Sequence, residues 1–71
     1  MTQKTLVHGV YVTYEENALQ GIHYLRDTLD MKEAKVFSDE ARTHGSAEFE
    51  DRERRQYTLI YQNGSYVLVR R

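Results

Sequence analysis

Four arginines near the carboxyl end of this 71-residue chain have the types and spacing that come closest to a recognisable binding chemistry. Arg54 and Arg55 precede a strand-like run, and Arg70 and Arg71 end the next one. Arginine beside a tyrosine such as Tyr57 can hold phosphates and stack on bases. The cluster therefore defines one candidate function, a nucleic-acid-binding module.

The charges around these arginines argue against that function. Residues 48–53 carry four acids and one arginine, a sum of −3, whereas residues 54–71 carry four arginines and no acid, a sum of +4. Adjacent blocks of opposite charge usually pair with each other or stay solvated. The whole chain has a formal net charge of only −1. Nucleic-acid binding is therefore the alternative to the favoured function given below.

No pattern typical of a metal, cofactor or catalytic site stands out. The sequence contains no Cys, and His8, His23 and His44 do not share a ligand spacing. His8 lies on the apolar side of its predicted strand, where a lone histidine is usually satisfied by hydrogen bonds or placed at an edge. A chain this short has little room for a pocket of about 300 Å³. We expect no enzyme activity, no cofactor and no metal.

The composition is that of one globular domain spanning residues 1–71. Hydrophobic residues make up 39% and charged residues 30%, a balance typical of folded rather than disordered chains. Residues 1–4 lack the apolar stretch of a signal peptide, and no apolar run approaches the length of a membrane span. With no Cys to form disulfides, these features predict a cytoplasmic protein that does not associate with membranes.

The first half of the chain predicts a strand, a helix and a second strand. Residues 4–13 are rich in strand-favouring residues. Residues 15–29 carry an apolar stripe of Ala18, Ile22, Leu25 and Leu29, widened by Leu19. Thr13 and Glu16 have the spacing of a capping box. Residues 34–38 predict a short buried strand that is parallel to the first.

The middle of the chain supports two interpretations. Residues 38–45 resemble one capped helical turn, with acids first, bases last and Gly45 after them. Residues 46–55 repeat that charge polarity, so we favour a second helix anchored by Phe49. The rival interpretation is an extended, charged edge strand.

A β-hairpin at the carboxyl end has the clearest signal. Asn63-Gly64 separates two alternating runs and predicts a two-residue type I′ turn, which pairs Gln62 with Ser65. This register divides the apolar side chains between two faces. One face carries Tyr57, Leu59, Tyr61, Tyr66 and Leu68, and the other carries Thr58, Ile60, Val67 and Val69.

These elements predict a two-layer α+β fold in the order β-α-β-(α)-β-β, with one main helix, a mixed sheet and a C-terminal hairpin. A layer of helices covers one face of a sheet, so we expect the other face to be an interface. Its residues would be Ile60, Val67 and Val69, or Tyr57, Tyr61 and Tyr66, depending on which face the helix covers. Small domains without disulfides or metals often self-associate. We therefore expect a homodimer that also binds another protein, acting as a non-enzymatic interaction or small regulatory or inhibitory domain.

Overall fold

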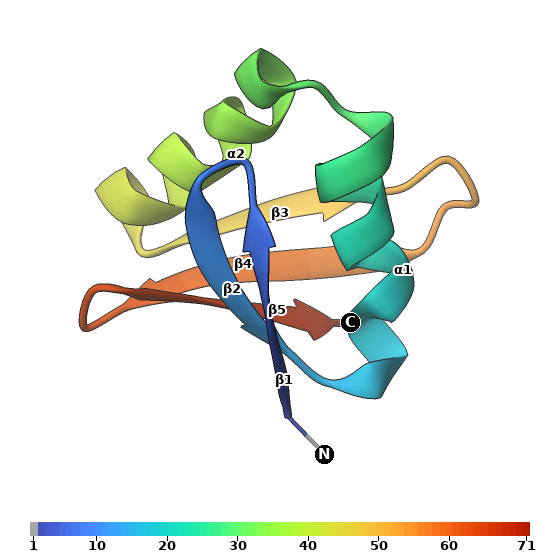
Figure 1. Ribbon diagram of the computed structural model, residues 1–71, viewed down its shortest axis with the longest axis horizontal. Helices are drawn as coiled ribbons and strands as arrows, with labels where there is room; N and C mark the ends of the chain where they lie inside the picture. Colours follow the sequence, from blue (N-terminus) through green and yellow to red (C-terminus); the bar gives the residue numbers. More distant parts are fainter. Residues whose placement is uncertain (1) are drawn as a thin grey trace.

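Residues 2–71, which the computed structural model describes, form a five-stranded sheet with two helical regions (Figure 1). The strands are β1 (Gln3–Val7), β2 (Val10–Tyr14), β3 (Ser46–Glu50), β4 (Gln56–Gln62) and β5 (Ser65–Arg70). The first helical region comprises a 3-10 turn, η1 (Glu16–Ala18), the helix α1 (Leu19–His23) and a π-helical turn, η2 (Tyr24–Thr28); the second is α2 (Met31–His44).

The strand order across the sheet is β1-β2-β5-β4-β3. Neighbouring strands are antiparallel except β2 and β5, which are parallel. The α+β class and the mixed sheet are therefore confirmed. The order along the chain differs from the prediction, because the β1–β2 hairpin precedes the two helical regions and three consecutive antiparallel strands, β3, β4 and β5, follow them.

The prediction of a single strand over residues 4–13 is wrong, because these residues form two antiparallel strands, β1 and β2, joined by a turn. His8 and Gly9 form a two-residue turn with φ of 46° and 88°, so Val7 pairs with Val10. Histidine enters the left-handed region more readily than most residues, and glycine enters it without strain. The turn reverses the chain, so Val7 and Val12 are both buried although a single strand would place them on opposite faces.

The helix predicted over residues 15–29 is present between Glu16 and Thr28. Ala18, Ile22 and Leu25 are buried as predicted. The predicted capping box is absent, because Thr13 belongs to β2 and the N-cap residue Glu15 makes no side-chain cap hydrogen bond. Leu19 is 38% exposed and does not widen the apolar stripe.

The strand predicted over residues 34–38 is wrong, because these residues lie inside α2. A capping box starts this helix: the Asp30 carboxylate accepts from the Glu33 amide, and the Glu33 carboxylate accepts from the Asp30 amide. The predicted stop at Gly45 is confirmed, since Gly45 has φ of 91° and its amide donates to Ala41. Val36 has high strand propensity, but the helix overrides it and leaves this side chain 63% exposed.

The helix favoured over residues 46–55 is also wrong, and the rival edge strand is correct. β3 alternates buried Ala47 and Phe49 with exposed Glu48 and Glu50. This period of two places both apolar side chains on the core side of the strand, whereas a helix would bury only Phe49. β3 pairs with β4 alone and therefore forms one edge of the sheet.

The C-terminal hairpin is confirmed in every pair of its predicted register, from Gln62 opposite Ser65 to Tyr57 opposite Arg70. Asn63 and Gly64 both have positive φ, 52° and 81°, as a type I′ turn requires. The local turn therefore fixes which side chains of β4 and β5 face the core.

The sheet curls around the core. In Figure 1 the β1–β2 hairpin crosses steeply in front of β3, β4 and β5, with α1 to one side and α2 above. The parallel contact of β2 with β5 covers only three residue pairs, which leaves the hairpin free to turn away from the other strands. The core includes Val7, Val12, Ile22, Leu25, Phe49, Tyr57, Leu59, Tyr66 and Leu68.

Candidate functional site

The helices cover the tyrosine-bearing face of the hairpin. Tyr57 and Tyr66 are buried in the core, and Tyr61 is partly buried with its ring edge-on to that of Tyr66 at 5.0 Å. Burial raises the pKa of both the Tyr57 and the Tyr66 hydroxyl. Of the two predicted interface sets, the one that the helices leave uncovered is therefore Ile60, Val67 and Val69.

We call the uncovered side of the sheet the outer face. Ile60, Val67 and Val69 are half-buried there by their neighbours in the sheet, and Ile60 lies directly opposite Val67. On the next strand Thr13 is the register partner of Val67. The outer face therefore continues from the hairpin onto β2, where Thr13 lies beside Val67.

Two further apolar side chains belong to the outer face, and the sequence analysis did not single them out. Leu6 and Tyr11 face each other across β1 and β2, with 51% and 61% of their surfaces exposed. The Lys4 ammonium lies 5.1 Å from the centre of the Tyr11 ring, a cation–π contact. The signal that could have found them is the His8-Gly9 turn, which places Leu6 and Tyr11 on one face.

The four arginines do not form one cationic surface. The Arg55 guanidinium is paired with Asp51 at 3.0 Å and Glu53 at 3.2 Å, and that of Arg71 is paired with Glu48 at 3.0 Å. Arg54 and Arg70 are exposed, at the loop before β4 and the end of β5 respectively. Two of the four charges are thus already neutralised by the acidic block.

Asp51 organises the loop between β3 and β4. Its carboxylate accepts from the amides of Glu53 and Arg55, from the Arg55 guanidinium and from the Tyr57 hydroxyl. Burial alone would raise the pKa of this carboxyl, but the hydrogen bonds from Arg55 and Glu53 outweigh it, so the pKa lies below its usual value. The role of Asp51 is therefore structural: it holds the loop between β3 and β4 and accepts the hydrogen bond of the buried Tyr57 hydroxyl.

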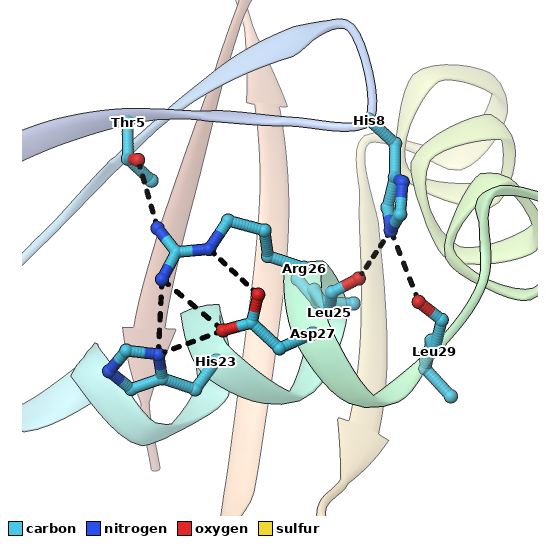
Figure 2. A network of polar contacts seen from close by, with 7 residues as sticks. All are labelled: Thr5, His8, His23, Leu25, Arg26, Asp27 and Leu29. Atoms are coloured by element: carbon cyan, nitrogen blue, oxygen red, sulfur yellow. Dashed lines mark hydrogen bonds and ion pairs between the residues drawn. The ribbon is translucent and has the colours of Figure 1, made fainter.

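Figure 2 shows the hydrogen bonds that join the β1–β2 hairpin to the first helical region. His8 Nε2 lies 3.0 Å from the carbonyl oxygen of Leu25 and 3.1 Å from that of Leu29. Both partners are acceptors, so this nitrogen donates. Arg26 bonds Thr5 of β1 at 3.4 Å and the Asp27 carboxylate, and the adjacent guanidinium lowers the pKa of Asp27. His8 is thus satisfied by structural hydrogen bonds, as expected.

A cavity of about 370 Å³ opens between the β1–β2 turn and α2. We call it the hairpin–helix groove. Its floor is apolar, and its rim carries His8 on the turn and Lys35, Asp39 and Arg42 on α2. The groove is partly open to solvent, and it exists because the hairpin turns away from the sheet and leaves a gap beside α2.

Within residues 2–71, no group of three or more His, Cys, Asp or Glu side chains could hold a metal ion. None of the helices in this part of the chain has the length and apolar character needed to cross a bilayer. Comparison of the chain with protein-family models, with curated proteins and with solved structures finds no match.

Proposed function

We propose that the protein is a non-enzymatic protein-binding domain that acts as a homodimer through the outer face of its sheet. The observation that carries the proposal is the apolar band formed by Leu6, Tyr11, Val67, Ile60 and Val69, which crosses four of the five strands. Apolar side chains gathered on the uncovered side of a sheet are typical of protein interfaces. We place this function in the cytoplasm, where a chain without Cys needs no disulfides.

The charges that flank the band favour a second copy as the occupant. Lys4 lies on β1 at one edge of the sheet, and Glu50 lies on β3 at the other edge, beside Glu48, which is already paired with Arg71. A two-fold axis running along β5, the central strand, would set β1 of one copy over β3 of the other. Each copy would then bring its Lys4 toward the edge that carries its partner's Glu50, so these two charges favour a face that is complementary to itself.

The size of the face also suits a dimer. The chain measures 28 × 27 × 20 Å, and its accessible surface is 4756 Å². A standard stable interface takes roughly 800 Å² from each partner, which is about one sixth of this surface. The 28 × 27 Å extent of the molecule is of the same order as that area. A regulatory or inhibitory role would follow from a second protein competing for, or binding beside, the same face.

The test is the mass in solution of the wild-type chain and three variants, measured by sedimentation at about 10–300 µM. We expect a dimer for the wild type and monomers for Val67→Glu and Tyr11→Glu, because each variant buries a charge in the interface. Tyr11 is largely exposed in the single chain, so that variant keeps its fold. Circular dichroism checks the folding of both.

Val36→Glu is the matched control, because Val36 is equally apolar and 63% exposed but lies on α2, away from the sheet face. This variant should remain a dimer. A wild-type chain that is monomeric at the highest concentration would refute the proposal. Equal dissociation by Val36→Glu and Tyr11→Glu would show that a different surface holds the copies together.

A further inference from the structure

The hairpin–helix groove lies on the inner side of the sheet and is not used by the proposed dimer. Its floor is formed by the core side chains of Val12, Leu59 and Tyr66, among others, and by Val10, which packs against the core. Its volume of about 370 Å³ lies within the range of about 300–1,000 Å³ typical of small-molecule sites. If each non-hydrogen atom of a ligand, with its hydrogens, takes about the 30 Å³ that one water takes in the liquid, the groove holds a ligand of about ten to twelve non-hydrogen atoms.

The charges on the rim discriminate between ligand classes. Asp39 is paired with Arg42 at 3.4 Å, so these two charges offset each other. Lys35 lies on the same helix, is exposed, and has no ion-pair partner among residues 2–71. His8 Nε2 is occupied by two backbone carbonyls. Among the described residues that line the groove, the charge without an ion-pair partner is therefore the Lys35 ammonium.

We propose that the groove binds a small amphipathic carboxylate, with its apolar body on the floor and its carboxylate at Lys35. Burial of a hydrocarbon or aromatic body against the apolar floor is favourable, because it removes apolar surface from water. The lysine supplies a charge-assisted hydrogen bond to an anion and disfavours a cation. The Tyr66 hydroxyl donates to the carbonyl of Ser38 at 3.2 Å, which keeps the ring in place as part of the floor.

Octanoate is a suitable probe, because its ten non-hydrogen atoms match the size of the groove. Titration of the ¹⁵N-labelled chain, followed by amide chemical shifts, reports both affinity and location. We expect saturable shifts at the groove residues of the β1–β2 turn and α2. Octanol and octylammonium have the same chain with a neutral or a cationic head, and both should bind at least about fivefold more weakly, since the ionic hydrogen bond is lost.

Two lysine variants separate a site from general attraction of an anion to the protein. Lys35→Gln should weaken octanoate binding about tenfold and leave octanol unchanged. Lys32→Gln is the matched control: Lys32 is exposed on the same helix but does not line the groove. It should bind octanoate as the wild type does. The proposal is overturned if the shifts lie outside the groove, if the three head groups bind equally, or if both lysine variants weaken binding alike.

Discussion

Replacing Gly21 by alanine sets two opposing effects against each other. Alanine in a helix interior is worth about 1 kcal/mol relative to glycine, so the local effect is stabilising. A Cβ atom at this position, however, would lie 2.8 Å from both Cδ1 and Cε1 of Tyr57 and 3.0 Å from Cδ2 of Leu68. Such distances are too short for carbon atoms, so either the helix or the ring must move.

The ring has little freedom to move. Tyr57 is fully buried, and its hydroxyl donates to the Asp51 carboxylate. Overpacking a core costs about 1–3 kcal/mol, and with the ring held at both ends we take the upper part of that range. After the helix gain is subtracted, Gly21→Ala should lower the free energy of unfolding by about 1–2 kcal/mol. The melting temperature should fall by about 5–15 °C.

The assay is urea unfolding followed by circular dichroism, with thermal melts in parallel. Gln20→Ala is the control on the same helix, because Gln20 is exposed and its truncation meets no clash. It should leave stability unchanged or slightly raised. Gly21→Ser should cost more than Gly21→Ala, since it adds a further atom at the same contact. A Gly21→Ala variant as stable as the wild type or more so would show that α1 does not pack this closely on β4 and β5.

Three further outcomes are expected. Ile22→Ala and Leu25→Ala should each lower the free energy of unfolding by about 2–5 kcal/mol in urea titrations, because both side chains are buried; a loss below about 1 kcal/mol would contradict the helix packing. The pKa of Asp51 is lowered in the folded state, so its contribution to stability is present above about pH 4 and is lost as the pH falls through the folded-state pKa. Urea titrations between about pH 2 and 6 should therefore show a flatter pH dependence for Asp51→Asn than for the wild type, and identical slopes would disprove this. Titration with RNA or DNA at physiological salt should show no binding tighter than about 1 µM; tighter binding that is lost in Arg70→Ala and Arg71→Ala variants would favour the nucleic-acid alternative.

The parts of the fold that the sequence predicts correctly are governed by local rules. Asn63-Gly64 sets the hairpin register because few residues other than asparagine and glycine accept positive φ at both turn positions. The apolar stripe of residues 18–25 sets the helix phase for a similar reason, since one repeated spacing decides which side is buried. The hairpin register also separates Ile60, Val67 and Val69 from the tyrosine-bearing face. It does not say which of these two faces the helices cover, and the burial of Tyr57 and Tyr66 decides that.

The errors have physical causes in particular residues. His8-Gly9 is a turn of the same kind as Asn63-Gly64, but histidine is a weaker turn signal. Val36 and the adjacent phenylalanine favour a strand by propensity, and the Asp30 capping box with the rest of α2 overrides them. In β3 the charge polarity suggested a helix, whereas the burial of Ala47 and Phe49 decides the outcome. The hairpin–helix groove depends on how the first hairpin turns away from the sheet, which no local pattern specifies.

The position of β5 at the centre of the sheet has a consequence for biosynthesis. β5 joins β2 on one side and β4 on the other, and the residues that it pairs with on β2 are 54 positions earlier in the chain, as in Val12 and Tyr66. Until β5 leaves the ribosome, the two earlier pairs of strands have no contact through the sheet. A nascent or truncated chain that stops before Ser65 therefore exposes the apolar surface of both pairs, and cellular proteases and chaperones would recognise it as incomplete.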